Sequence, residues 1–511
     1  MAIVAATVAI AALHWPNDGL WFQGDAPRHA ANGLFALDLL RALPTDPIAF
    51  ALSYYARYPI IVVGAYPPLF YLLEAAAFSL TTPSPHVSKT LVLAFSAVAA
   101  MYTMKYGRRW ISPVAGWAGV CLALTPGFSL FSNTVLLNVP ATALGLGALY
   151  HCRSWMDTSR VSQRNLFVGL TAAMLSTYYP AVVVVPVLVA WMWVGLRPNK
   201  LRALFLTIAT AVLVVLIGLA VPTYLTRHLI PLDRLFAQWR WLSLVNNLWS
   251  LTGAWWLILG CGGILLGLVR SERRNEAVRL ATTVVLIAAG LSVTWHDPRY
   301  GLILVPITIL SAFLGIAIIA ELWPRGQAIV LASAVVVALG VSGQTAVAKK
   351  FPIVSGFESV AEYLRLEGPR DTVLYAGYYD GVFGFHLRAS DPMLEGRLVI
   401  FRKLIDSRQR APGITAPDIV NLIRSECGCQ WIAIERDKRR RNGPPMSELR
   451  AALAGPEFAL VRSFAVQSPV TDRVDVYRTL IPVQPITSVD LTFPGFSQRV
   501  YRGVTPIKSR R

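Results

Sequence analysis

Long apolar stretches without charges recur along the first 348 residues, separated by short polar connections. A transmembrane helix needs about 20 consecutive, mostly apolar residues to cross the hydrocarbon core of a bilayer. Eleven stretches come near this length, and we predict spans near residues 1–14, 89–106, 112–127, 137–151, 166–178, 179–195, 203–222, 249–269, 278–293, 301–320 and 328–346. The pattern therefore predicts a mainly α protein, with a polytopic transmembrane helical bundle over residues 1–348.

The composition agrees with a membrane protein. Of the 511 residues, 55% are apolar and only 15% are charged, whereas soluble domains carry about 25% charged residues. The formal net charge of +19 is spread over both sides of Lys349, so it does not form one nucleic-acid-binding tail. Each Lys or Arg near an anionic membrane surface contributes about 1 kcal/mol to binding. We therefore predict membrane lipids as partners and no nucleic acid.

Basic residues concentrate in alternate connections between the predicted spans. These connections are Lys105–Arg109, Arg153–Arg164, Arg197–Arg202, Arg270–Arg279 and the loop of Arg325. Positively charged loops stay in the cytoplasm, so residues 15–88, residues 223–248 and the turn Trp295–Arg299 face outward. This alternation requires Tyr66–Leu80, although apolar, to lie along the outer surface as a juxtamembrane helix. We predict a multi-pass protein of the cell (plasma or inner) membrane.

Residues 349–511 differ from the preceding part. Their apolar runs shorten to strand length at Thr372–Tyr375 and Trp431–Ile434, with helical patterns at 357–366 and 416–426 between them. We predict a soluble extracytoplasmic α/β domain. Cys427 and Cys429, separated by one glycine, can pair in an oxidising compartment. We favour the alternative, in which a buried thiol and its neighbour stand at the start of a strand.

Several motifs typical of nucleotide-dependent and metal-dependent enzymes are absent. The sequence has no phosphate-cradling glycine loop of the P-loop type, no HExxH and no DxD pair, so a nucleotide-sugar donor is not indicated. Asp25 follows the first span and opens a helical pattern that contains His29. A carboxylate beside lipid can have its proton affinity raised enough to act as a general base. The alternative is that Asp25 only caps the helix.

A second candidate group surrounds two prolines. Tyr66, Phe70 and Glu74 are spaced four residues apart, which on a helix places an acid on the same face as two aromatic rings. Such rings can stack on a sugar or an isoprenoid. The alternative is an interfacial aromatic anchor with a snorkelling glutamate.

The third candidate group precedes a late span. Arg299 stands at the outer end of a predicted helix, next to His296, Asp297 and Tyr300. A guanidinium can bind a phosphate through two parallel hydrogen bonds; the alternative is an Arg–Asp pair that closes a tight turn. Lys89, at the outer start of the second span, is either another phosphate partner or an interfacial anchor.

Together these residues resemble the GT-C superfamily of integral-membrane glycosyltransferases. The similarity is to the branch with protein O-mannosyltransferases and the lipid A aminoarabinose transferase, and it covers most of the first 350 residues. The matching elements are the acidic Asp25 after the first helix, Tyr66-Pro67-Pro68-Leu69-Phe70 for an (H/Y/K)PPL(Y/F) element, Asn138-Val139-Pro140 for an Asp-x-Pro, and Arg299-Tyr300 before a late helix.

The chain departs from this family at three places. Ala26 stands where a second acid is common, Asn138 replaces an acid, and Tyr178-Tyr179-Pro180 stands where many relatives carry a lysine. A hard divalent cation needs several carboxylate oxygens, which Asp25 then lacks nearby. We therefore predict no metal ligands and no certain cofactor, with a divalent cation as the less favoured alternative.

The resemblance implies transfer of a sugar from a polyprenyl-phosphate carrier to a hydroxyl of a glycan, lipid or protein acceptor, on the extracytoplasmic face and with inversion. Asp25 would be the general base, and Arg299, with Lys89 or Arg57, would offset charge on the leaving phosphate. The remaining predicted substrate contacts are His29, Tyr66, Phe70, Glu74, His296 and Tyr300. The C-terminal domain would cover the site or select the acceptor.

Two rival functions remain open at this stage. A transporter or lipid flippase also has many helices, but it usually places charges at mid-membrane and often has two related halves. Here the predicted spans hold few charges and no repeat is detectable. An inactive scaffold of the same fold is the other alternative, because Ala26 and Asn138 depart from the family pattern.

Overall fold

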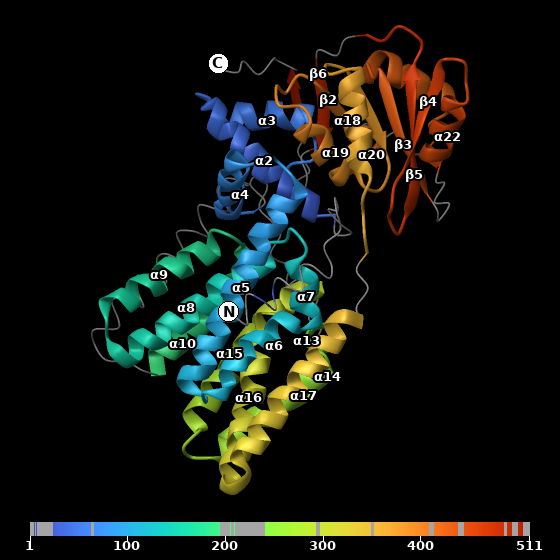
Figure 1. Ribbon diagram of the computed structural model, residues 1–511. Coiled ribbons are helices and arrows are strands. Elements are labelled where there is room, and N and C mark those ends of the chain that lie inside the picture. Colours follow the sequence, from blue (N-terminus) through green and yellow to red (C-terminus); the bar gives the residue numbers. More distant parts are fainter. Residues whose placement is uncertain are drawn as a thin grey trace.

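In the computed structural model the chain forms a helical bundle, a group of outer helices at one end of it, and an α/β domain beyond them (Figure 1). The structure describes residues 24–62, 66–194, 241–292, 297–348, 352–407, 413–437, 444–484, 488–492 and 499–503, with isolated helical positions at Ala5, Thr7, Phe205 and Ala209. The spans predicted at 1–14 and 203–222 lie outside the described segments.

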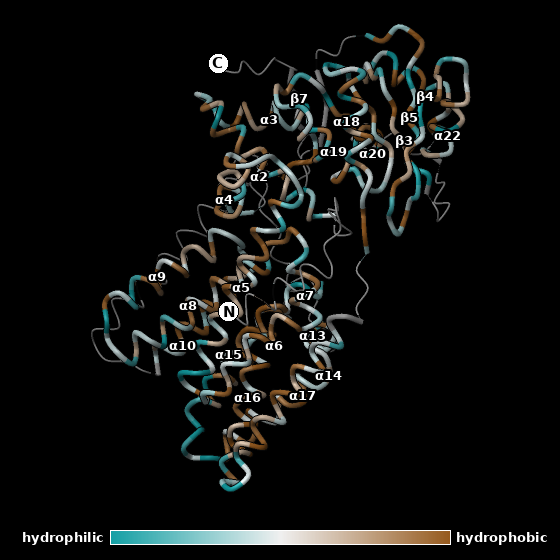
Figure 2. The backbone as a smooth tube through the Cα atoms, viewed as in Figure 1, coloured by the Kyte–Doolittle hydropathy of each residue, from teal (hydrophilic) through white to brown (hydrophobic). Residues whose placement is uncertain are grey.

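Four described helical segments are long and apolar enough to cross a membrane. They are α5 (Pro85–Trp110), α15 (Arg274–Ser292), η3 with α16 (Pro298–Ile303 and Leu304–Leu322), and η4 with α17 (Pro324–Gly326 and Gln327–Ala348). The hydropathy colouring of these helices is largely brown (Figure 2). The described residues therefore contain helices that could be membrane spans, in agreement with the prediction.

Two bent pairs add to these helices if each pair is one span. η1 and α6 (Val114–Trp117 and Ala118–Leu124) meet α7 (Pro126–Ser132) at 56°, and α13 (Trp241–Thr252) meets α14 (Ala254–Val269) at 108°. Three shorter predicted spans correspond to α8 (Asn138–Thr158), α9 (Val161–Leu175), and η2 with α10 (Tyr179–Val184 and Val185–Val194). Length and composition thus support four to six spans among the described residues, and the predicted number of eleven is not confirmed.

α14 and α16 pack through a stripe of small residues. Gly260, Gly263 and Gly267 of α14 face α16, and a Cβ on Gly263 would lie 1.9 Å from the carbonyl oxygen of Ser311. Small residues at such positions let two membrane helices approach closely. Most of α16 is buried by this and other contacts, so η3, which leads directly into α16 and carries Arg299, is held by the bundle.

The basic connections of the bundle meet at one end. Arg153 of α8 donates to Glu276 of α15 at 2.7 Å, and Arg273, between α14 and α15, donates to the carbonyl of Ile111 after α5 at 3.1 Å. The loops that the alternation of charges assigns to one side of the membrane therefore lie together. The outer helices lie at the opposite end of the bundle (Figure 1).

The outer helices are α2 (Ala26–Ala42), α3 (Pro47–Arg57) and α4 (Leu69–Leu80). α3 begins where Asp46 caps it by accepting hydrogen bonds from the amides of Ile48 and Ala49, each at 2.9 Å. α4 packs against α2 and lies beside it outside the main bundle (Figure 1). The segment predicted to stay at the surface thus forms a short helix beside the bundle.

The described part of the C-terminal region is an α/β unit around a five-stranded sheet of order β2-β1-β3-β5-β4. β1 pairs in parallel with β2 and β3, while β5 pairs antiparallel with β3 and β4. The strands are β1 (Thr372–Ala376), β2 (Arg397–Ile400), β3 (Trp431–Asp437), β4 (Phe458–Ala465) and β5 (Thr471–Thr479). The two apolar runs identified in the sequence are β1 and the first part of β3.

Helices cover the sheet of this domain, and a separate strand pair follows it. The helices are α18 (Phe357–Glu367), α19 (Asp380–Ala389), α20 (Phe401–Ser407), α21 (Ala416–Asn421), η5 (Leu422–Cys427) and α22 (Pro444–Leu453). The pair consists of β6 (Ser488–Thr492) and β7 (Arg499–Gly503), which run antiparallel.

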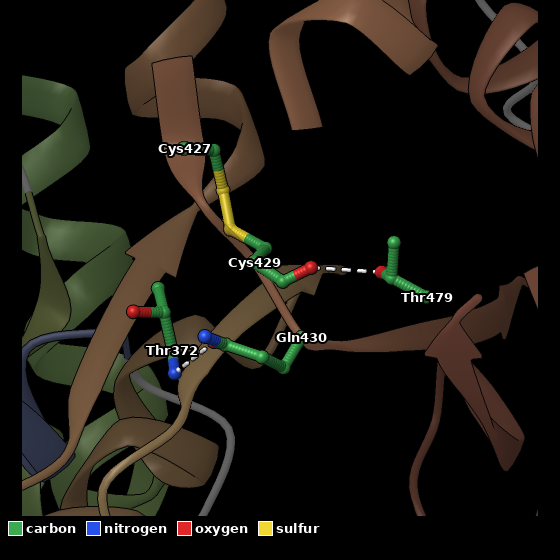
Figure 3. The surroundings of a disulfide bond; sticks show 5 residues. All are labelled: Thr372, Cys427, Cys429, Gln430 and Thr479. Atoms are coloured by element: carbon green, nitrogen blue, oxygen red, sulfur yellow. Dashed lines mark hydrogen bonds between the residues drawn. A yellow bond between two sulfur atoms is a disulfide. The ribbon is translucent and has the colours of Figure 1, made fainter. Parts of the chain in front are cut away.

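A disulfide joins Cys427 and Cys429 where η5 leads into β3 (Figure 3). Both cysteines are buried, and Thr479 of β5 donates to the carbonyl of Cys429 at 2.7 Å. Our preference for unpaired thiols at these positions was therefore wrong. The positive φ of 56° at Gly428 lets the chain turn between the two cysteines, since glycine adopts this conformation at little cost.

Candidate active site

The site is built around an ion pair between two distant parts of the chain. Arg299 lies in η3, and its Nη2 donates to Oδ2 of Asp25 at 2.8 Å. Asp297 also faces this guanidinium, with Oδ2 at 3.5 Å from Nε, and its other carboxylate oxygen accepts from the backbone amide of Arg299 at 3.1 Å. One guanidinium therefore lies between two carboxylates at the end of the bundle nearest the outer helices.

Asp25 precedes α2 but does not cap it through its side chain. The capping alternative from the sequence is therefore not what the structure contains, and the carboxylate turns to Arg299 instead. Burial alone raises the pKa of Asp25, but the positive charge of Arg299 opposes burial and the resulting pKa lies below its ordinary value. The predicted rise in proton affinity is wrong for this arrangement, in which Asp25 is an ionised, charge-paired carboxylate.

His29 lies one turn further along α2 and forms part of an aromatic wall. Its Nδ1 is 2.8 Å from the hydroxyl of Tyr71, and its ring meets that of Tyr66 edge-on at a centroid distance of 5.0 Å. Burial lowers the pKa of His29 to about 4, so the imidazole is neutral at neutral pH. It adds shape and hydrogen bonding to the site but no charge.

Three tyrosines from separate segments stack beside Arg299. Tyr66 and Tyr178 have centroids 6.2 Å apart at an interplanar angle of 19°, and Tyr178 and Tyr300 are 6.2 Å apart at 23°. The guanidinium carbon of Arg299 lies 5.6 Å from the centroid of Tyr300, within the range of a cation–π contact. Aromatic faces and a cation are thus presented together.

A small pocket, with free space of about 20 Å³, opens beside this stack. Its walls come from the start of α8, from η2, the end of α15 and η3; the polar members are Asn138, Thr142, Tyr178, Arg299 and Tyr300, and the others are Ala141, Pro180, Ala181, Val183, Leu291 and Ile303. Arg299 is the one charged side chain among the described residues of this lining. Hydroxyl and amide groups around a single cation are suited to a polar ligand with a negative charge.

Similar folds are found among solved structures. ArnT from Cupriavidus metallidurans, bound to undecaprenyl phosphate, aligns with a TM-score of 0.58 at 13% identity, covering 95% of this chain and 98% of that chain. An oligosaccharyltransferase from Archaeoglobus fulgidus aligns with a TM-score of 0.58 at 11% identity, covering 85% and 69%. The chain shares its fold with these proteins, which are GT-C glycosyltransferases. The resemblance identified in the sequence is therefore confirmed at the level of the fold.

The arabinofuranosyltransferase AftD from Mycobacteria also has the GT-C fold. It aligns with a TM-score of 0.59 at 13% identity, covering 96% of this chain and 40% of that chain. No protein-family model matches the sequence, and no curated protein does. At these identities the comparison establishes architecture, so the activity has to be argued from the site.

Several predicted site residues lie elsewhere in the GT-C fold. Glu74 and Phe70 are fully buried, with Glu74 packed against Gly33 of α2. Lys89 is fully buried in the first turn of α5, and Arg57 donates to the carbonyl of Leu394 in the C-terminal domain. None of the four lines the cavity. His296 lies outside the described residues.

Sequence reasoning left Tyr178 and Thr142 out of the candidate set. Tyr178 ends the α9–η2 connection directly before Tyr179-Pro180. The helix break that Pro180 causes is the signal in the sequence that could have identified Tyr178. Thr142 lies one turn into α8 after Asn138, which the family motif did identify. Both face the cavity of the GT-C fold together with Arg299.

The residues near Asp25 do not fit a divalent cation. No group of three metal-ligating His, Cys, Asp or Glu side chains occurs within the described segments, and the nearest carboxylates, Asp25 and Asp297, have the guanidinium of Arg299 between them. A hard cation prefers six or more oxygen ligands, and the positive charge of Arg299 would repel it.

Proposed function

We propose that this protein is a membrane glycosyltransferase that moves a sugar from a polyprenyl-phosphate carrier to an acceptor hydroxyl, with inversion at the anomeric carbon. The observation that carries the proposal is the contact between Asp25 and Arg299 at the edge of a small pocket. A carboxylate able to take a proton then adjoins a cation able to bind a phosphate. Two solved structures with a similar fold hold undecaprenyl phosphate and dolichol-phosphate, which supports a polyprenyl-phosphate donor.

The reaction needs only these two groups to account for its charges. Asp25 accepts the proton of the acceptor hydroxyl as that oxygen forms a bond to the anomeric carbon. The bond from this carbon to the phosphate oxygen breaks, and its electron pair leaves with the lipid phosphate. Arg299 offsets the charge that develops on the leaving group. Attack opposite the departing phosphate inverts the configuration.

The other residues of the site position the sugar. The faces of Tyr66, Tyr178 and Tyr300 offer stacking surfaces, as aromatic rings do in many ligand sites, while Asn138 and Thr142 offer hydrogen bonds to hydroxyl groups. His29 holds Tyr71 and Tyr66 in place through its hydrogen bond and ring contact. The buried Lys89, Glu74 and Phe70, and Arg57 with its contact to the C-terminal domain, receive no part in the chemical step. The acceptor is a glycan, lipid or protein hydroxyl, and the C-terminal domain helps to select it.

We place the site on the extracytoplasmic face. The basic connections that contain Arg153 and Arg273 lie at the opposite end of the bundle, and such connections stay in the cytoplasm. The disulfide of the α/β domain supports the same orientation, because disulfides persist in oxidising compartments. Labelling of single cysteines at the exposed positions Leu80 and Arg160, with Cys261 replaced, should occur from opposite sides of sealed vesicles.

Incubation of the purified full-length protein with a panel of polyprenyl-phosphate sugars tests the activity. Release of free polyprenyl phosphate, together with a glycosylated acceptor, is the expected result for one member of the panel. A flippase would move the lipid across a vesicle membrane without breaking the bond to the sugar. Absence of release from every donor by well-folded protein contradicts the proposal.

A further inference from the structure

Two carboxylates contact the guanidinium of Arg299. Nη2 contacts Asp25 at 2.8 Å and Nε contacts Asp297 at 3.5 Å. Two carboxylates and one guanidinium carry one net negative charge, which the nearby cation Arg28 offsets. An anionic phosphate therefore finds no excess of positive charge at Arg299 unless one carboxylate gives up its place there.

The two carboxylates are not held equally. Asp297 is two residues from Arg299 and accepts a hydrogen bond from its backbone amide at 3.1 Å, so leaving would uncap η3. Asp25 has no side-chain cap on α2, and its side chain is 33% exposed, against 25% for that of Asp297. Asp25 is thus the carboxylate that can be displaced.

A phosphate is also the better partner for the vacated position. A guanidinium binds phosphate through a fork of two parallel hydrogen bonds, whereas Asp25 makes a single one at Nη2. The cavity lies against Arg299, with Asn138, Thr142 and Tyr300 around it. A phosphate seated there has neutral donors on its other sides.

We propose that the donor phosphate and Asp25 compete for Arg299, so that donor binding releases Asp25 to act on the acceptor. This inference rests on the proposed function and adds an order to it. In the absence of donor the carboxylate stays paired and is a weak base. Once its partner is taken and an anion lies nearby, the carboxylate binds a proton more readily. Arg28, His29 and Tyr66 are the other titratable groups that interact electrostatically with Asp25, and the histidine among them is neutral.

Binding of undecaprenyl phosphate to the full-length protein in nanodiscs of zwitterionic lipid tests the competition. Removal of the competing charge in Asp25→Asn should tighten binding about threefold to tenfold. Asp46→Asn is the matched control: it removes one negative charge from the outer helices and retains the cap of α3, so its affinity should equal that of the wild type. The double variant Asp25→Asn/Arg299→Gln should lose the gain.

The possible results separate the two claims. Equal or weaker binding by Asp25→Asn overturns the competition, and the transferase proposal still stands if wild-type protein releases lipid phosphate from donors. Absence of both binding and release in the wild type overturns the two together. An equal gain in Asp46→Asn also overturns the competition, because it would reflect overall charge. If Asp25→Asn does not fold, Asp25→Ser removes the same charge and takes its place.

Discussion

Helix α2 is bordered by an Asp–Arg ion pair at each end, and the two pairs differ in what surrounds them. Before its first residue, Asp25 meets Arg299 of the bundle, with side chains 33% and 11% exposed. In its last part, Asp38 meets Arg388 of the C-terminal domain, with side chains 8% and 3% exposed. The same two functional groups thus occur once beside a cavity and once inside the protein.

The pair of Asp38 and Arg388 is called the inner pair here, and that of Asp25 and Arg299 the outer pair. Further hydrogen bonds complete the inner pair. Tyr54 of α3 donates to Asp38 at 2.8 Å and accepts from Nε of Arg388 at 2.9 Å, while Nη1 of Arg388 donates to the carbonyl of Asp391. Every nitrogen of this guanidinium has a partner within the protein. Buried pairs of this kind fix a geometry but leave no group for a ligand. The surroundings of each Asp–Arg pair, and not the pair itself, decide whether it joins two parts of the protein or can take part in chemistry.

The inner pair belongs to a larger contact between the outer helices and the α/β domain. Tyr58 donates to Asp391, and Lys403 donates to the hydroxyl of Tyr55 at 3.2 Å. Near the other end of α2, a Cβ on Gly381 would lie 2.9 Å from Cγ of Pro27. The C-terminal domain therefore contacts α2 at both ends, and the position of Asp25 depends on that docking.

Neutralising the acid of the outer pair should have the largest effect on activity. Asp25→Asn is expected to lower turnover by about 10²- to 10⁴-fold, the usual contribution of a general base. The unfolding midpoint should stay close to that of the wild type, since the carboxylate caps no helix. Sugar transfer from the lipid donor and thermal unfolding measure the two quantities; unchanged turnover would exclude Asp25 as the base.

Breaking the inner pair should instead affect stability. Arg388→Leu leaves the buried carboxylate of Asp38 without its cation, which costs about 3–5 kcal/mol. We expect a lower unfolding midpoint and faster proteolysis of the α/β domain. Arg370→Gln is the control, because its pair with Glu395 is largely exposed and its loss should leave the midpoint unchanged. Equal effects of both variants would contradict the distinction between the pairs.

A conservative change of the outer cation should act on the donor. Arg299→Lys replaces a planar fork by a point charge, so the KM for the lipid donor is expected to rise about tenfold. The KM for the acceptor should change less. Steady-state kinetics with each substrate varied in turn measures both constants, and equal changes in the two would argue against phosphate binding by Arg299.

Acidification should lower the stability of the fold through His29, which lies near the start of α2. Its pKa of about 4 lies below the ordinary 6.5, so between these values the unfolded chain binds a proton that the folded chain does not. Stability therefore falls as the pH drops from 6.5 towards 4, by about 1 kcal/mol for each pH unit. His29→Gln should show a smaller fall. Unfolding midpoints of the two proteins across this range provide the test, and parallel curves would contradict it.

The meeting of Asp25 and Arg299 was predictable from the sequence because charge alternation and motif order place both on one face. The contribution of the α/β domain was not, since Arg388 pairs with a residue 350 positions away and no local pattern records it. The pKa of Asp25 was misjudged for the same reason: burial was considered without the charge of its partner.

The grouping of Tyr66, Phe70 and Glu74 rested on a helical spacing that begins too early. α4 starts at Leu69, because the preceding Pro67-Pro68 pair keeps Tyr66 outside the helix. Tyr66 is therefore free to join Tyr178 in the stack, whereas Glu74 turns inward to Gly33. The two prolines divide a presumed single face into two parts with different surroundings.

The stripe of glycines through which α14 contacts α16 helps to fix the position of the Arg299 guanidinium. Because Gly263 has no side chain, the two backbones touch, and the register of α16 is set by that contact several turns away from Arg299. A single methyl group added at Gly263 would shift α16, and the guanidinium of Arg299, which lies just before α16, would move with it. The position of Arg299 thus depends on glycines of α14 that carry no side chain of their own.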